Sequence, residues 1–181
     1  MMRKLVLLAI FAVGVFFTSN AQFKIGANLN VGIPTGDLND AVGIGVGGTV
    51  TGLYEFSNSF AAGVQIGYIS FAEKDNSGIT FSVIPITAVG KYYFSESNFK
   101  PYISADLGLY SMKAKASMLM SAYDISVSAT KTNFGVAPAL GFEYLLSEKL
   151  LLDANAKYTN IFTEDSPTSY LGINVGFVYK F

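Results

Sequence analysis

The C-terminal stretch of the chain, residues 170–181, alternates between two kinds of side chain. One set is apolar or aromatic and comprises Leu171, Ile173, Val175, Phe177, Tyr179 and Phe181. The intervening positions from Gly172 to Lys180 are small or polar, apart from Val178. Because successive side chains of a strand project to opposite faces, this segment has one apolar face and one polar face. The pattern predicts a strand in the wall of a membrane β-barrel, between lipid and a polar interior.

The N-terminal residues have the features of an export signal. Arg3 and Lys4 precede an apolar run over residues 5–17, and Ser19-Asn20-Ala21 places small residues where a signal peptidase reads them. The run is shorter than the ~20 residues of a membrane-spanning helix. We therefore expect residues 1–21 to be a cleaved secretory signal peptide and residues 22–181 to form a single domain.

Composition favours a membrane protein without spanning helices. Charged residues make up 14% of the chain and hydrophobic residues 51%, whereas soluble domains contain about 25% charged residues. Past the signal, no apolar stretch approaches the ~18 residues of a spanning helix. A closed barrel is the other structure that satisfies every backbone group in lipid.

Eight strand-like segments are expected. They cover residues 23–31, 42–56, 60–71, 79–94, 102–112, 126–144, 150–158 and 170–181. The predicted fold class is all-β, an eight-stranded antiparallel transmembrane up-and-down β-barrel. Pro85 predicts a bulge in the fourth strand and Pro138 an irregularity in the sixth.

The connections alternate in length. The shorter links are residues 57–59, 95–101 and 146–149, and the longer ones are residues 32–41, 72–78, 113–125 and 160–168. Outer-membrane barrels keep short turns in the periplasm and long loops outside the cell. This pattern predicts a cell outer membrane protein with extracellular long loops and both mature termini in the periplasm.

Aromatic residues gather near the predicted strand ends, as expected for two girdles at the lipid headgroups. The periplasmic girdle is predicted to contain Phe23, Tyr54, Phe56, Phe60, Tyr92, Tyr93, Phe94, Tyr102, Phe142, Tyr144, Tyr179 and Phe181, and the outer girdle Tyr68, Phe71, Phe81, Tyr110, Phe134, Tyr158 and Tyr170.

The predicted inner faces carry a balanced set of charges. They comprise Lys24, Lys91, Lys157 and Lys180, and Glu55, Asp106, Glu143 and Asp153. Because an unpaired charge is costly in a low-dielectric tube, we expect these groups to pair, bridged by Asn28, Gln65, Asn155 and Asn174, and to close the lumen. The alternative is a proton or ion path lined by carboxylates. Eight strands leave an interior that side chains fill, which favours closure.

The residue inventory argues against an enzyme. The chain has no histidine and no cysteine, so the usual proton-transfer base and any thiolate ligand are missing. The glycines of residues 43–48 keep strand parity and no helix signal follows, so they indicate close packing instead of a phosphate loop. We expect no catalytic residues, no cofactor and no metal. The mature chain has no arginine and is weakly acidic, which argues against nucleic acid as a partner.

Several segments resemble the small outer-membrane β-barrel domain family, which includes the OmpA, OmpX and OmpW barrels. They are residues 23–31, Pro34-Thr35-Gly36-Asp37, Tyr92-Tyr93-Phe94, Pro101-Tyr102 and the aromatic end at Phe181. The resemblance implies that Phe177, Tyr179 and Phe181 form the signal read by the barrel-assembly machinery. It implies no peptidoglycan-binding module, and outer-membrane lipid as the surroundings.

Residues 113–125 are more apolar than a solvated loop requires, with Met118, Leu119, Met120 and Tyr123 among them. One interpretation is a hairpin above the membrane that binds a surface partner through its edge. Another is an OmpW-like mouth that admits small hydrophobic solutes. Loop carboxylates such as Asp37, Asp75 and Asp165 are interpreted as solvated charges. A remaining alternative for the whole chain is a secreted, soluble, lipocalin-like binding barrel, which would turn the apolar set inward.

Overall fold

The computed structural model describes residues 23–74, 79–120, 123–163 and 166–181. The predicted signal peptide, residues 1–21, lies outside them. Eight strands follow one another along the chain: β1 (Phe23–Thr35), β2 (Val42–Glu55), β3 (Phe60–Glu73), β4 (Ile79–Tyr93), β5 (Phe99–Met120), β6 (Tyr123–Ser147), β7 (Leu150–Ile161) and β8 (Thr168–Lys180). A short helix, α2 (Asp37–Ala41), joins β1 to β2. Within the described ranges, no helix is long and apolar enough to cross a membrane.

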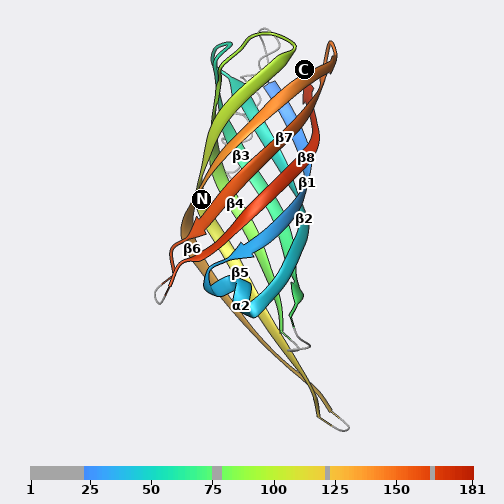
Figure 1. Ribbon diagram of the computed structural model, residues 1–181, viewed down its shortest axis with the longest axis vertical. Coiled ribbons are helices and arrows are strands. Elements are labelled where there is room, and N and C mark those ends of the chain that lie inside the picture. The colour runs from blue at the N-terminus through green and yellow to red at the C-terminus, as the bar shows by residue number, and fades with distance from the viewer. Residues whose placement is uncertain (1–22, 75–78, 121–122, 164–165) are drawn as a thin grey trace, which may run out of the picture.

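Each strand pairs antiparallel with its neighbours in sequence, and the first strand also pairs with the last. The β1–β8 ladder runs from Lys24 opposite Lys180 to Thr35 opposite Ser169. This ladder closes the sheet into a barrel, as Figure 1 shows. The predicted fold class is confirmed.

The apolar set of alternate residues covers the outside of the barrel. On β8, Val175 and Phe177 are 49% and 54% exposed, whereas Asn174 and Val178 are 6% and 2% exposed. Leu29 on β1 is 77% exposed. An apolar exterior around a polar interior is the reverse of what the soluble, lipocalin-like alternative requires.

The strand register is irregular at two points, and neither of them is at a proline. No register shift occurs at Pro85 or Pro138, so the predicted bulge at Pro85 is wrong, although both positions lack a partner in one of their two ladders. The shifts lie instead between Val42 and Gly45 and between Leu145 and Ser147. The first of these turns Val42 inward, where it is 2% exposed.

The two ends of the barrel differ strongly. Short turns and the C-terminus lie at one end, which we call the short-turn rim, and α2 lies at the other, the long-loop rim (Figure 1). The predicted long loops 32–41 and 113–125 are largely regular structure. The first contains the end of β1 and α2, and the second consists mainly of β5 and β6, which form a hairpin that projects beyond the barrel (Figure 1). The turn into α2 requires a positive φ of 58° at position 36, which Gly36 adopts without strain because it has no Cβ.

Candidate functional site: the closed lumen

All eight charged residues that the sequence assigns to the lumen lie on the inner face of the barrel. They are Lys24, Glu55, Lys91, Asp106, Glu143, Asp153, Lys157 and Lys180, and each takes part in at least one ion pair. Alternation along seven strands brings these side chains inward. Closure of the barrel then makes residues distant in sequence neighbours across the lumen.

Glu143 on β6 occupies the centre of the largest cluster. Its side chain is 0% exposed, and its Oε2 lies 2.8 Å from Nζ of Lys24 on β1. Its Oε1 accepts hydrogen bonds from Nζ of Lys91 at 3.0 Å and from the hydroxyl of Tyr93 at 2.8 Å. Both carboxylate oxygens are thus bound to donors from other strands, β1 and β4.

The cluster extends from Glu143 in both directions. On one side, the carboxylate of Glu55 forms ion pairs with Nζ of Lys24 at 2.8 Å and with Nζ of Lys180 at 3.2 Å. On the other, Nζ of Lys91 lies 3.1 Å from the carboxylate of Asp153. The same carboxylate accepts a hydrogen bond from the hydroxyl of Tyr102 at 2.8 Å. The result is a chain of six charges of alternating sign, the pairing that burial in a low-dielectric interior requires.

A second cluster lies nearer the long-loop rim. Lys157 forms an ion pair with Asp106, and Gln65 bonds both of them, each at 3.2 Å. Thr51 donates to the same Gln65 oxygen at 3.3 Å. Asp106 is 1% exposed, and the Lys157 ammonium and the Gln65 amide replace water at its Oδ2, whereas its Oδ1 has no hydrogen-bond partner among the described residues.

The bridging amides predicted from the sequence join this system. Asn28 and Asn155 donate to the same oxygen of Asp153, at 3.1 Å and 2.9 Å. Asn174 donates to Asn155 at 2.6 Å and accepts a hydrogen bond from Asn30. A continuous polar layer therefore occupies the middle of the lumen.

An apolar plug, which the sequence analysis did not predict, fills the lumen at the long-loop rim. Its buried members are Leu38, Val42, Ile69, Phe71, Val83, Tyr110, Met112, Ile161 and Tyr170. The ring of Phe71 packs edge-on against that of Tyr170, with centroids 5.4 Å apart. Leu38 from α2 completes the plug and is 8% exposed. Helix α2 thus contributes to closing the mouth of the barrel.

Five rings that were predicted to lie in the lipid girdles are buried inside instead, and a sixth, Phe81, packs against the apolar plug. Phe71, Tyr93, Tyr102, Tyr110 and Tyr170 are between 1% and 3% exposed. The alternation of side chains along each strand could have placed three of them correctly. Tyr93 is on the same strand face as Lys91, and Tyr102 and Tyr110 are on the same face as Asp106. Near the short-turn rim, the ammonium of Lys91 lies 4.0 Å from the centroid of the Tyr102 ring, a cation–π contact.

Other predicted girdle rings are exposed on the outer wall. At the short-turn rim they include Phe56, Phe60, Tyr92, Phe94, Tyr144, Tyr179 and Phe181, and nearer the other rim Tyr68, Phe134 and Tyr158. The residues of the predicted assembly signal, Phe177, Tyr179 and Phe181, are 54%, 42% and 51% exposed on the outside of the barrel.

Some of the loop carboxylates lie within the described residues and others do not. Asp37 accepts a hydrogen bond from the hydroxyl of Ser166 at 2.6 Å, and Asp40 is exposed. Asp75, Glu164 and Asp165 lie outside the described residues.

A closed sheet with an apolar exterior and paired charges inside defines a transmembrane β-barrel protein. Comparison with known proteins identifies the family. Residues 5–181 match the outer membrane protein beta-barrel domain, and the chain belongs to this family.

Individual relatives agree with this assignment. Outer membrane protein PagN of Salmonella typhimurium is 35% identical over 74 residues, which cover 39% of this chain and 31% of PagN. Outer membrane protein W of Vibrio cholerae is 33% identical over 93 residues, 44% of this chain and 38% of that protein. The matched segments thus span only about a third of each relative's length.

Solved structures share the fold. Neisserial surface protein A has a TM-score of 0.65 at 20% identity, covering 90% of this chain and all of that one. OprG from Pseudomonas aeruginosa has a TM-score of 0.59 at 18% identity, covering 89% of this chain and 96% of OprG. The protein is therefore an integral outer-membrane β-barrel protein.

Proposed function

We propose that the lumen is permanently closed and that the protein serves a structural or surface-interaction role, not solute passage or catalysis. The observation that carries this proposal is the pairing of all eight lumen charges by ion pairs that join different strands. The apolar plug supports it further, because hydrated ions would have to displace buried rings such as Phe71 and Tyr170.

Planar-bilayer recording of the refolded protein tests closure. We expect no lasting conductance, because an eight-stranded barrel leaves an interior just wide enough for side chains and here those side chains bond to one another. Stable open channels would contradict the proposal and favour an ion path lined by the carboxylates.

For orientation, we propose that the short-turn rim faces the periplasm and the long-loop rim faces the outside of the cell. The rule that outer-membrane barrels keep short turns periplasmic supports this arrangement. Both ends of the mature domain then lie in the periplasm, since the amide of Phe181 donates to the carbonyl of Phe23 at 3.1 Å at the short-turn rim.

The projecting β5–β6 hairpin is the proposed contact surface for another protein. Along β6, pairing with β7 stops at Gly135, whereas pairing with β5 continues to Tyr123. The carbonyl of Phe134 still accepts a hydrogen bond from the amide of Phe162, at 2.9 Å. The edge of β6 over residues 123–133 is therefore available for addition of a strand from a partner. An OmpW-like mouth for small hydrophobic solutes is the second candidate, favoured by the apolar residues of the hairpin sequence and by the likeness to outer membrane protein W.

Two further partners belong to this proposal. Outer-membrane lipid surrounds the apolar wall, and the barrel-assembly machinery reads Phe177, Tyr179 and Phe181 during insertion. The exposure of these three side chains along the outside of the terminal strand supports such a reading. The mature chain's lack of arginine argues against nucleic acid as a partner.

A further inference from the structure

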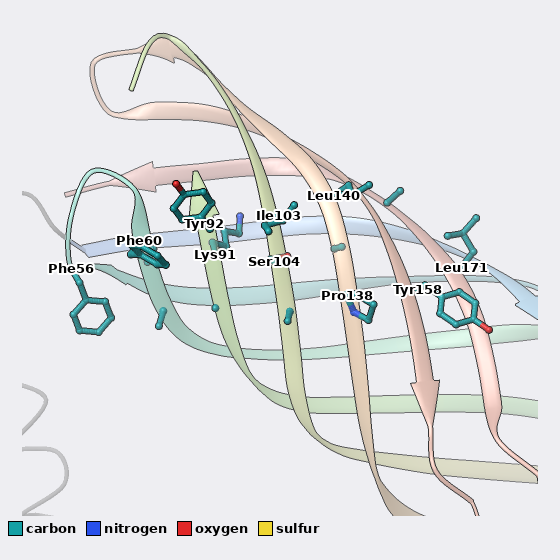
Figure 2. Close-up of a pocket in the computed structure, with 16 residues that line it drawn as sticks. Phe56, Phe60, Lys91, Tyr92, Ile103, Ser104, Pro138, Leu140, Tyr158 and Leu171 are labelled. Carbon is teal, nitrogen blue, oxygen red and sulfur yellow. The ribbon is translucent and has the colours of Figure 1, made fainter. Parts of the chain in front are cut away.

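The outer wall carries an apolar groove with a volume of about 760 Å³. It crosses strands β3 to β8 on the face that meets lipid. Figure 2 shows Phe60 and Tyr92 at one end of the groove, Tyr158 and Leu171 at the other, and Pro138 between them. Of the eight lumen charges, Lys91 alone is among the residues that line the groove, and its ammonium is bound to Glu143 and Asp153 on the inner side of the wall.

The floor of the groove is a row of small residues on adjacent strands. Ala62 pairs with Gly90, Gly90 with Ala105, and Ala105 with Pro138. Since neighbouring strands lie ~4.8 Å apart, this row is roughly 14 Å long. It runs across the strands, along the direction of the hydrogen bonds.

Bulky side chains flank the floor. The row towards the short-turn rim consists of Phe60, Tyr92, Ile103 and Leu140, which are direct cross-strand partners and are all exposed. The row on the other side consists of Val64, Ala88, Leu107 and Val136. The floor is therefore one residue row wide, with bulky side chains on both sides except at Ala88.

No contact within the chain requires a glycine at position 90. A Cβ atom at Gly90 would meet nothing within 4 Å, and its backbone is not in the left-handed region. By contrast, a Cβ at Gly47 would lie 2.0 Å from the carbonyl oxygen of Tyr68. Glycine weakens a strand, and in strands it often marks the close approach of another molecule. The free space above Gly90 points to an occupant that is not part of this chain.

We propose that this groove binds one acyl chain of a membrane phospholipid, with the headgroup at the short-turn rim. The groove is continuous with the lipid-facing surface of an integral membrane protein, and its exposed lining is hydrocarbon. Its floor is too narrow for a helix ~10 Å across. At the rim, the rings of Phe60 and Tyr92 lie 4.8 Å apart, where aromatic residues meet lipid headgroups.

Native mass spectrometry of the detergent-solubilised protein with added palmitoyl-oleoyl phosphatidylethanolamine tests this binding. The test variant is Gly90→Leu, which fills the floor without a clash. The matched control is Gly52→Leu on β2, a second wall glycine whose added Cβ would meet only the ring of Phe23, at 3.7 Å. The heat-dependent shift in electrophoretic mobility reports whether each variant folds, and Gly90→Val replaces Gly90→Leu if the latter does not.

We expect one retained phospholipid per wild-type barrel, at least fivefold weaker binding in Gly90→Leu, and wild-type binding in Gly52→Leu. Phosphatidylglycerol with the same chains is expected to bind within twofold, whereas dioctanoyl phosphatidylethanolamine is expected to bind at least fivefold more weakly. Equal binding by wild type and Gly90→Leu, or binding set by the headgroup alone, would overturn the proposal. So would a wild-type dimer that Gly90→Leu abolishes without change in lipid binding, because a second copy would then be the occupant.

Discussion

Glu143 is the residue on which the ionic network converges. It is fully buried, and it binds Lys24 on β1 and Lys91 and Tyr93 on β4. Replacing a buried ion pair with apolar residues is often neutral, but removing one partner alone is strongly destabilising, because the remaining charge is left buried without compensation.

We therefore expect Glu143→Gln to lower the free energy of unfolding by about 3 kcal/mol, within the range for a broken buried pair. Urea unfolding of the protein refolded into lipid vesicles measures this change. The control is Glu96→Gln, since Glu96 is exposed in a turn and accepts one hydrogen bond, from Asn58 at 3.1 Å. Its expected effect is below about 0.5 kcal/mol, and equal effects at the two positions would contradict a stabilising role for the network.

At the scale of single elements, the β5–β6 hairpin differs most from the rest of the barrel. These strands contain 22 and 25 residues, whereas the other six contain between 12 and 15. On β6, the ladder with β7 ends at Gly135, and residues 123–134 lie beyond it. On β5, only residues 117–120 lie beyond the ladder with β4, which ends at Ala116. Most of the extra length of β6 therefore adds little to the closure of the barrel.

We predict that deleting residues 116–122 leaves the barrel folded, with an unchanged heat-dependent mobility shift, and abolishes partner capture measured by cross-linking on intact cells. A Gly/Ser replacement of equal length keeps the reach of the hairpin but removes its strand-forming residues, and it should lose capture as well. Loss of hydrophobic-solute uptake into vesicles, with capture unaffected, would favour the OmpW-like mouth instead. If neither property changes, the hairpin is not the contact surface.

At the scale of the whole molecule, the barrel is apolar outside and polar inside. Of two adjacent residues on β8, Asn174 faces the lumen and is 6% exposed, whereas Val175 is on the outer wall and is 49% exposed. Because the chain has no cysteine, single cysteines can carry probes at each site. A bimane label on Val175→Cys should be strongly quenched by nitroxide-labelled phospholipid, and one on Asn174→Cys only weakly. Similar quenching at both positions would contradict the assignment of faces.

The proposed orientation has its own test with the same single-cysteine strategy. Ser128 is exposed on the hairpin and Ser97 is exposed in a short turn. On intact cells, a membrane-impermeant maleimide should label Ser128→Cys and leave Ser97→Cys unlabelled until the outer membrane is opened. The reverse pattern would place the short turns outside.

Local periodicity predicted much of this architecture because a strand's two faces can be recognised from a few consecutive residues. All eight strands were predicted, with boundaries that fell short mainly at the long-loop rim. The errors arose where local signals conflict. Proximity to a strand end suggested a lipid girdle for Tyr93, Tyr102 and Tyr110, but their parity with Lys91 and Asp106 places them inside. The inward position of Val42 could not be predicted either, because the register shift beside it leaves no signature in the composition.

The sequence by itself determined that this chain forms a barrel wall and which charges lie within it, since alternation is a property of neighbouring residues. Only the tertiary structure decided which charges meet. Lys24 and Glu143 are 119 positions apart, and their contact depends on the stagger of all eight strands after closure. The same holds for the groove, whose floor consists of Ala62, Gly90, Ala105 and Pro138. These residues have no relation along the chain and become neighbours through hydrogen-bond register alone.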